Sequence, residues 1–393
     1  MLGVSTAWLV AAGNSFGQEI NPSFNAQKIS VPLEYQESAN AVASRNVSVT
    51  LQNAPFAKEP PAVSGKTLRG HLEFNSKATN CISFLWQQSE GRLFLDLNRD
   101  GDLTDDPAGA FSSASANHSS YQTFTNVHLG FDTAQGHLSV CADLLFWNYG
   151  SRPTCNLSLR SFWQGEINLN GRDYQIGLVP VALNPDKPAD GARLLLRPWE
   201  KRNEAFNVFD GSLATVPYQN KLFINGQAAE LDLQGAAVAG EWKPTVQLEK
   251  QVAALGSLKI DGKFIRRMVL SSGAYLVVLD QPADTVPVPT GSYAAPDVLL
   301  EQGGVAASCV HSSPRISKAV NVDGITPVIL NIGGPLTNSV LASRRGPDLR
   351  LDYQLVGAGG MSYKLINQDR THPPEFAVYK GENKLTSGNF EFG

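Results

Sequence analysis

Apolar and polar residues alternate with a period of two over many short stretches of this 393-residue chain. Residues 47–51, 349–355 and 375–379 are examples, each with an apolar side chain recurring at every second position. Successive side chains of a β-strand point to opposite faces, so this pattern predicts strands with one packed face and one wet face. Residues 244–256 are the one stretch where a short helix competes with a strand.

Turn residues separate several of these alternating runs. Asn and Gly, and to a lesser degree Asp, tolerate the positive φ angles that a type I′ hairpin turn needs at both central positions. Hairpins are therefore predicted at Asn170-Gly171, Asn225-Gly226, Asp261-Gly262 and Asp323-Gly324. The irregular spacing of these sites argues against a propeller or a solenoid. We expect an all-β, antiparallel, multi-domain β-sandwich protein with little helix.

The length of the chain suits two or three domains at about 150 residues each. Residues 286–300 contain a Pro-x-Gly-x-Tyr element, which resembles the edge turn of Ig-like and prealbumin-like bacterial modules. We expect an N-terminal β domain over 18–200, a middle β domain over 201–315 and a C-terminal Ig-like β-sandwich over 316–393. The chain as a whole resembles secreted bacterial proteins of β-sandwich type.

The N-terminus has most features of a secretory signal. Residues 2–12 are apolar and uncharged, and Ser15-Phe16-Gly17 supplies a small-x-small cleavage pattern. No Lys or Arg precedes the apolar run, so a buried first strand is the alternative. A signal peptide over 1–17 would make the protein secreted, periplasmic or attached to the cell surface. No later run reaches the roughly 18 apolar residues of a transmembrane helix, so no membrane span is expected.

Charged residues make up 17% of the chain, and the formal net charge is −4. This fraction lies below the ~25% that is usual for soluble globular proteins and favours an extracytoplasmic protein. Basic residues such as Arg344-Arg345 occur in pairs rather than clusters. A nucleic-acid partner would need a positive face, so we expect none.

The most distinctive chemistry lies in residues 92–106, RLFLDLNRDGDLTDD. Calcium prefers six to eight oxygen ligands, and a chain supplies them by placing Asp or Asn at alternate loop positions with a Gly at the sharp bend. Here Gly101 takes the bend. The metal-binding candidates are Asp96, Asn98, Asp100, Asp102 through its carbonyl, Thr104 through water, Asp105 and Asp106. This spacing resembles the D-x-N-x-D-G loop of EF-hand and dockerin proteins, which implies calcium as the cofactor.

Two departures from the EF-hand pattern change the expected site. The twelfth position, where a bidentate Glu belongs, is Pro107, and the approach at 93–97 alternates like a strand rather than a helix. We therefore expect a strand-borne loop in which Asp105 or Asp106 replaces the missing carboxylate. Its calcium affinity should lie in the extracellular range, about 10⁻⁴ to 10⁻³ M. A solvated acidic turn without an ion is the alternative.

Two further features lie between residues 141 and 155. Cys141 and Cys155 are the nearest cysteines in the sequence and form a candidate disulfide in an exported protein, with buried thiols as the alternative. Phe146, Trp147 and Tyr149 fall in an expected loop between them. Exposed aromatic rings on a β scaffold can stack on sugars, so these three residues are the candidate ligand surface.

Enzyme motifs are weak in this sequence. The G-x-S-x-G match at 13–17 lies in the signal segment and lacks the strand-turn-helix that a nucleophile elbow requires. His128 and His137 are predicted to face each other across a hairpin as a polar pair. The sequence predicts an exported calcium-binding module, binding or structural, whose partner is a carbohydrate or a cell-surface component. A secreted polysaccharide hydrolase that uses carboxylates from several strands is the alternative; enzymatic activity is the less favoured class.

Overall fold

The computed structural model describes residues 28–61, 65–75, 80–114, 120–148, 152–310, 319–366 and 373–390. The predicted signal peptide, 1–17, lies outside these ranges. The described chain is almost entirely β. Its helices are short 3₁₀ turns, namely η2 (Pro107–Gly109), η3 (Trp199–Lys201) and η4 (Ala358–Gly360). The predicted all-β, multi-sheet class is confirmed.

The largest sheet contains strands from both halves of the chain. Its N-terminal strands are β1 (Lys28–Pro32), β3 (Ala43–Leu51), β4 (Thr67–Glu73), β5 (Cys81–Gln87), β6 (Arg92–Asp96), β7 (Ala110–Ser112), β8 (Tyr121–Thr133), β9 (Gly136–Trp147) and β10 (Thr154–Leu159). Its later strands are β15 (Lys221–Ile224), β16 (Gln227–Val238), β17 (Glu241–Gln251), β19 (Ile265–Ser271), β20 (Leu276–Asp280), β23 (Asp297–Gln302), β24 (Val305–Cys309), β27 (Thr337–Arg345), β28 (Asp348–Val356) and β29 (Ser362–Leu365).

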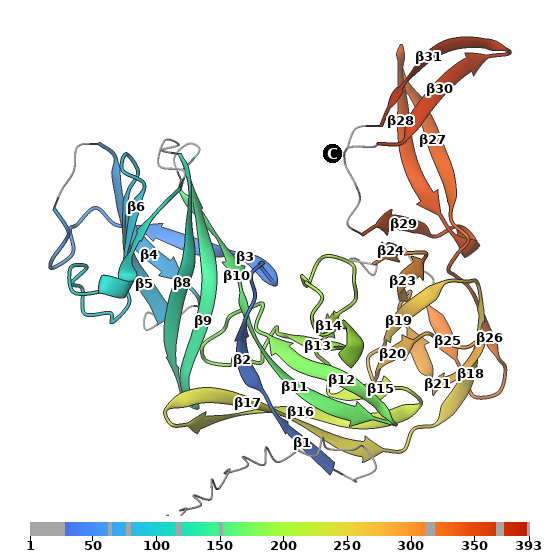
Figure 1. The fold of residues 1–393 in the computed structure, drawn as a ribbon, viewed down its shortest axis with the longest axis horizontal. Helices are drawn as coiled ribbons and strands as arrows, with labels where there is room; N and C mark the ends of the chain where they lie inside the picture. The colour runs from blue at the N-terminus through green and yellow to red at the C-terminus, as the bar shows by residue number, and fades with distance from the viewer. Residues whose placement is uncertain are drawn as a thin grey trace, which may run out of the picture.

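Smaller sheets complete the fold (Figure 1). One has five strands, in the order β14 (Thr215–Pro217), β13 (Arg193–Pro198), β12 (Arg172–Val179), β11 (Ser161–Leu169) and β2 (Glu34–Glu37). Another combines β21 (Thr285–Pro289), β18 (Leu255–Asp261) and β26 (Val328–Asn331). Two pairs remain, β22 (Gly291–Tyr293) with β25 (Val320–Val322) and β30 (Glu375–Lys380) with β31 (Asn383–Asn389). Most neighbouring strands are antiparallel; β15–β20, β18–β26 and the short contact of β17 with β9 are parallel.

Two large hydrophobic cores share one wall of strands. In β15, Leu222 and Ile224 face the first core, whereas Phe223 faces the second. In β20, Val278 faces the first core and Val277 faces the second. Strands buried on both faces read as continuous apolar runs, which explains why these two do not alternate. The first core therefore continues well past residue 200, and the domain divisions expected near 200 and 315 remain predictions.

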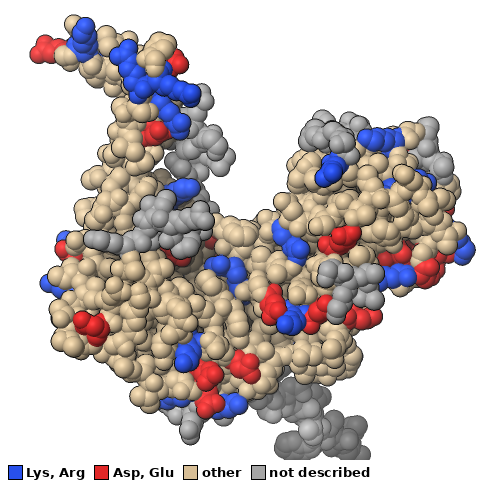
Figure 2. Space-filling model, turned by 180° about the vertical axis from the view of Figure 1, so that it is seen from behind, with Lys and Arg blue, Asp and Glu red and all other residues tan. Residues whose placement is uncertain are grey.

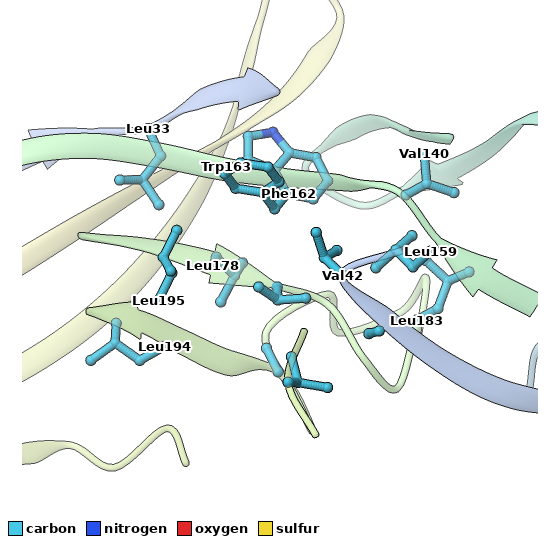
Figure 3. Close-up of a cluster of buried hydrophobic side chains, with 14 of the residues drawn as sticks. Leu33, Val42, Val140, Leu159, Phe162, Trp163, Leu178, Leu183, Leu194 and Leu195 are labelled. Carbon is cyan, nitrogen blue, oxygen red and sulfur yellow. The ribbon is translucent and has the colours of Figure 1, made fainter. Parts of the chain in front are cut away.

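The five-stranded sheet closes over the first core (Figure 3). Side chains from β11, β12 and β13 meet residues from the start of the chain: Phe162, Trp163, Leu178, Leu194, Leu195, Leu33 and Val42. Trp163 also packs edge-on against Trp242 of β17, with ring centroids 5.0 Å apart. Such aromatic pairs add about 0.5–1.5 kcal/mol beyond their buried area. This packing ties the two sheets together close to the ends of β2 and β9.

The C-terminal hairpins project from the second core (Figure 1). The β27–β28 hairpin is largely exposed, whereas Val320, Val322 and Tyr363 are buried in the core. Arg344 and Arg345 lie at the end of β27, where both residues are exposed. On the face that Figure 2 shows, acidic and basic side chains are otherwise mixed. The Ig-like form expected for 316–393 remains a prediction.

The predicted hairpin turns divide into two outcomes. Asn170-Gly171 and Asn225-Gly226 have positive φ at both residues and join β11 to β12 and β15 to β16. The other two predictions are wrong. The chain after Asp261-Gly262 does not fold back, because β18 pairs with β21 and β26 instead. At Asp323-Gly324, β25 pairs with β22 and does not form a hairpin with the following strand. Residues 244–256, for which the sequence left a short helix and a strand as alternatives, form strands: they contain most of β17 and the start of β18.

Candidate functional site

The acidic loop leaves the end of β6 and returns through η2, which begins at Pro107. This arrangement confirms that a strand, not a helix, precedes the loop. Leu103 anchors the loop in a small separate hydrophobic cluster with Leu85 and Phe94. The Leu103 backbone N–H also donates to the Lys58 carbonyl at 3.1 Å. The loop is therefore held on the sheet by apolar packing as well as by its own polar groups.

The oxygen-bearing side chains at the three predicted alternate positions turn inward along the loop. The Gly101 N–H donates to Asp96 Oδ2 at 3.2 Å, and the Asp100 N–H donates to Asn98 Oδ1 at 3.0 Å. The Asp102 N–H donates to Asp100 Oδ1 at 2.8 Å. Each carboxylate or amide thus fixes a backbone amide a few residues further on. These contacts hold the chain in a tight curve with its side-chain oxygens near the bend.

Asp96 has one oxygen that no group satisfies. The residue is only 2% exposed, and its Oδ1 atom is buried without a hydrogen-bond partner. The carboxylate is directed into the loop, because its other oxygen accepts from Gly101. A buried polar group without a partner costs about 1–3 kcal/mol, and more when it is charged. A cation bound beside this oxygen would remove that cost.

Asp102 has a different partner. Its Oδ2 lies 2.5 Å from Lys58 Nζ, and its Oδ1 accepts from the backbone N–H and hydroxyl of Thr104. Lys58 holds the pKa of Asp102 at about 2. The side chains of Asp102 and Thr104 are therefore engaged with each other, and the Asp102 carbonyl is the group left to serve a cation. Sequence reasoning missed Lys58, because no local spacing connects it with the loop.

Asp105 and Asp106 lie at the end of the loop. The Leu97 N–H donates to Asp106 Oδ2 at 3.0 Å, which draws the two ends of the loop together. Partial burial raises the pKa of Asp106, and the nearby charges of Asp96 and Asp105 raise it further. The pKa of Asp105 is raised by the same kind of desolvation and by the charge of Asp100. In both cases desolvation is the larger cause, and the neighbouring carboxylates add to it.

The single base of the loop does not supply that compensation. Arg99 adopts a positive φ of 63° and directs its guanidinium away, where Nη2 donates to the Gly130 carbonyl at 2.6 Å. The guanidinium also lies 5.6 Å from the centroid of the Phe131 ring. Its charge is used to attach the loop to β8.

The loop carboxylates are not gathered as tightly as the side chains of a loaded metal site. Asn98 Nδ2 lies between Asp100 Oδ2, at 3.2 Å, and Asp105 Oδ1, at 3.5 Å. In the described ranges, the one group of three His, Cys, Asp or Glu side chains with ligand atoms within 4.8 Å of one another is Glu37, His128 and Cys141. A calcium ion in the loop would have to draw the carboxylates closer together.

The histidine pair predicted on the β8–β9 hairpin is wrong. His128 pairs with Cys141 and His137 pairs with Asp132, so the two histidines are not opposite each other. The two strands pair without interruption from Thr133–Gly136 at the turn to Val127–Ala142, so the position of the turn decides which residue lies opposite His128. A turn centred two residues earlier would have placed the two histidines opposite each other, and local alternation does not fix the position of a turn to that precision.

The predicted aromatic surface is also corrected. Phe146 is fully buried, with ring centroids 5.2 Å from both Phe84 and Trp86. Trp147 is partly buried, and Tyr149 lies outside the described residues. Phe146 belongs to the aromatic centre of the first core because β9 continues to Trp147, into the segment that was expected to be a loop. It cannot stack on a ligand from solvent.

The candidate disulfide between Cys141 and Cys155 is wrong. Both residues carry unbonded thiols. Cys155 lies opposite Phe146 in the β9–β10 pairing, five positions along β9 from Cys141. At ~3.4 Å per residue this separation is about 17 Å, whereas bonded cysteines need Cα atoms within about 7 Å. The alternative of buried thiols is confirmed for these two cysteines.

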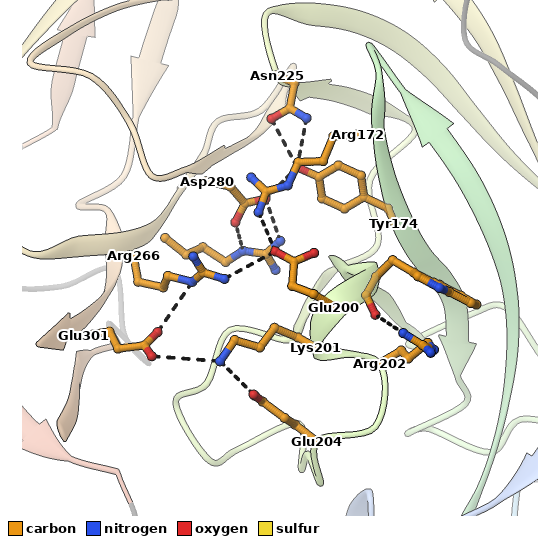
Figure 4. A network of polar contacts seen from close by, with 12 residues as sticks. Arg172, Tyr174, Glu200, Lys201, Arg202, Glu204, Asn225, Arg266, Asp280 and Glu301 are labelled. Carbon is orange, nitrogen blue, oxygen red and sulfur yellow. Dashed lines mark hydrogen bonds and ion pairs between the residues drawn. The ribbon is translucent and has the colours of Figure 1, made fainter. Parts of the chain in front are cut away.

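A cavity of about 420 Å³ lies between η3 and strands β19, β20 and β23 (Figure 4). Three of its four carboxylates are held in ion pairs: Asp280 with Arg267 at 2.6 Å, Glu301 with Arg266 at 3.5 Å, and Glu204 with Lys201 at 2.7 Å. The fourth, Asp210, accepts hydrogen bonds from the backbone N–H groups of Asn207 and Ser212. Asp280 is buried, yet the charge of Arg267 keeps its pKa below the usual value. A hydrolase needs one protonated and one free carboxylate, so this cavity gives the hydrolase alternative no support.

No family model, curated protein or solved structure matches this chain. Within the described ranges, no helix has the length and apolar character needed to cross a bilayer. The function must therefore be inferred from the side chains themselves.

Proposed function

We propose that residues 96–106 form a structural calcium site in an exported β-sandwich protein that serves as a binding or structural module. The observation that carries this proposal is the buried, unpartnered Oδ1 of Asp96. A carboxylate oxygen in that position is stabilised by a cation and is costly without one. Loop spacing alone would be equally consistent with a solvated turn.

The surrounding groups are those that calcium prefers. Asp96, Asn98 and Asp100 provide side-chain oxygens, the Asp102 carbonyl can provide a backbone oxygen, and Asp105 or Asp106 can replace the carboxylate missing at Pro107. Two bases lie near the five acids of residues 96–106: Arg99 is directed out of the loop, and Lys58 is paired with Asp102. Together they suit a hard, oxygen-seeking divalent ion.

A structural role fits the attachment of the loop. Leu103 is buried, Lys58 is paired with Asp102, and β6 enters the loop directly from the sheet. The loop is flanked by β6 and η2, and not by a pair of helices whose angle could change on calcium binding as in an EF-hand sensor. A bound ion would therefore hold β6 and η2 together and would not drive a conformational change. An affinity of about 10⁻⁴ to 10⁻³ M would suffice outside the cell, where calcium is plentiful. The Ig-like form of the modules and a carbohydrate or cell-surface partner belong to the same proposal.

The test is calorimetry and thermal unfolding with calcium or with chelator, on the wild type and on Asp96→Asn. Calcium at a hundred times its Kd should stabilise the wild type by about 2.7 kcal/mol. Asp96→Asn should remove most of that gain, because it removes the charge at the unsatisfied oxygen. The matched control is Asp323→Asn, at an exposed turn outside the loop. Absence of any heat or melting shift in the wild type at millimolar calcium would refute the site.

A further inference from the structure

A second set of metal-ligand atoms lies at the junction of two sheets. Glu37 at the end of β2, His128 of β8 and Cys141 of β9 place their ligand atoms within 4.8 Å of one another. His128 Nδ1 is 3.7 Å from Glu37 Oε1. We propose that these three side chains bind a divalent transition-metal ion of the zinc class. This site is independent of the calcium loop.

The fold brings these residues together through register. The β8–β9 hairpin pairs without interruption from Thr133–Gly136 at the turn to Val127–Ala142, which places His128 opposite Cys141. Glu37 arrives from the other sheet, where it pairs with Ser161. The Cys141 N–H donates to the Ser161 hydroxyl at 3.0 Å, which joins the two sheets at this point. All three ligands are thus positioned by regular strands rather than by free loops.

The environment of Cys141 is unusual for a buried cysteine. Its neighbours on the same face of β9, Ser139 and Asp143, are polar and partly exposed, whereas Val140 and Ala142 face the core. Cys141 is nevertheless fully buried. It is covered on the outward face, where Glu37 and His128 lie close to its sulfur. A structural thiol would be expected on the core face, where Cys155 lies.

The chemistry of the donors selects the ion. A thiolate, an imidazole and a carboxylate match the ligand set of zinc, with bonds of about 2.0 to 2.3 Å. A soft sulfur ligand disfavours calcium and magnesium. Thiolate and carboxylate together balance the two positive charges of the ion. Binding replaces the thiol proton with the metal, so one proton should leave to solvent for each ion bound.

Access and orientation also suit a metal. The side chains of His128 and Glu37 are 63% and 40% exposed, so an ion can enter from solvent. The Tyr35 hydroxyl donates to Glu37 Oε1 at 2.9 Å and orients the carboxylate, as outer-shell partners of metal ligands do. Three protein ligands leave a fourth tetrahedral position for water.

The experiment uses Co²⁺ as a spectroscopic probe of the full chain under reducing conditions, followed by displacement with Zn²⁺. A stoichiometric thiolate-to-cobalt charge-transfer absorption and tetrahedral d–d bands are expected, and Zn²⁺ should remove both. Cys141→Ser should abolish the charge-transfer absorption. His128→Ala should weaken cobalt binding by more than tenfold, since even outer-shell changes cost about 10- to 100-fold.

His137→Ala is the matched control, because His137 lies on the same hairpin but pairs with Asp132. It should leave the cobalt spectrum and affinity unchanged. His128 is exposed, so His128→Ala should melt at the wild-type temperature in the absence of metal, which separates lost binding from lost folding. The proposal is overturned if wild type shows no thiolate charge transfer at stoichiometric cobalt. It is equally overturned if the absorption persists undiminished in His128→Ala or disappears in His137→Ala.

Discussion

The acidic loop and the Glu37–His128–Cys141 cluster are both candidate cation sites, yet they are built in opposite ways. The loop takes its oxygens from residues 96–106, and its hydrogen bonds span only a few positions. The cluster takes its donors from three strands in two sheets. A site of the first kind depends on local spacing, whereas one of the second kind depends on strand register. Changes in one should therefore leave the other intact.

The largest expected effect comes from removing the buried side chain that anchors the acidic loop, which should affect the loop and not the cluster. Leu103 is buried against Leu85 and Phe94, so Leu103→Ala should lower the free energy of unfolding by about 2–3 kcal/mol, the lower end for buried leucines. It should also weaken calcium binding, because the loop loses its anchor. The cobalt spectrum of the cluster should not change. Urea denaturation and cobalt titration measure the two outcomes.

Val252→Ala is the control for Leu103→Ala, since Val252 is 99% exposed and should change stability by no more than about 0.5 kcal/mol. A parallel loss of cobalt binding in Leu103→Ala would show that the two sites share a cooperative unit. That result would contradict the independence argued above.

A smaller effect is expected from the outer shell of the cluster. Tyr35→Phe removes the hydroxyl that donates to Glu37 but keeps the ring that packs edge-on against Trp163 at 5.7 Å. Cobalt affinity should fall about tenfold, equivalent to 1.4 kcal/mol, with little change in stability without metal. Calcium binding should be unaffected. Competition titration with a chelating dye measures the affinity.

Tyr121→Phe serves as the comparison for Tyr35→Phe, because Tyr121 is an exposed tyrosine at the first residue of β8, away from His128. It should leave cobalt affinity at the wild-type value. If Tyr35→Phe also binds cobalt normally, the hydroxyl does not orient Glu37, and the positioning role assigned to Tyr35 is wrong.

The hairpin predictions show where sequence reasoning holds. Asn-Gly pairs at 170–171 and 225–226 form the predicted turns because both residues accept positive φ. Gly262 is small for another reason: a Cβ there would lie 1.7 Å from the Ile332 carbonyl oxygen, so glycine permits a close backbone approach. Asp323 accepts hydrogen bonds from Ile325 and Thr326 without reversing the chain into a hairpin. One dipeptide pattern thus serves several structures.

The same limit applies to the candidate sites. The strand-borne approach to the acidic loop and the inward oxygens of Asp96, Asn98 and Asp100 follow from local alternation, and the structure has them. The burial of Phe146 and the separation of Cys141 from Cys155 depend on the length and pairing of β9. Pairing between distant strands is set by the whole core. No local pattern records it, which is why these predictions failed.

Lys58→Met is expected to have the smallest effect on stability, and it tests whether Lys58 competes with a bound ion for Asp102. The Lys58 side chain is 71% exposed, so solvent screens its ion pair with Asp102, and the pair should contribute little to the free energy of unfolding. Removing it deletes a positive charge and releases the Asp102 carboxylate, which is then free to turn toward the ion. Charge count tunes calcium affinity in such loops, so calcium should bind more tightly, by up to about tenfold.

Lys66→Met is the control for Lys58→Met, because Lys66 lies outside the loop. Its backbone carbonyl accepts a hydrogen bond from the Gln88 N–H, and this contact does not involve the side chain that the substitution changes. It should not alter calcium affinity. Isothermal titration measures the calcium affinity of both variants. Tighter binding in Lys58→Met alone means that Lys58 competes with the ion for Asp102. Weaker binding in Lys58→Met would mean instead that Lys58 holds the loop in its binding shape. Asp102 would then act as a structural partner of Lys58, and the ion would have to be held by Asp96, Asp100 and the two acids before Pro107.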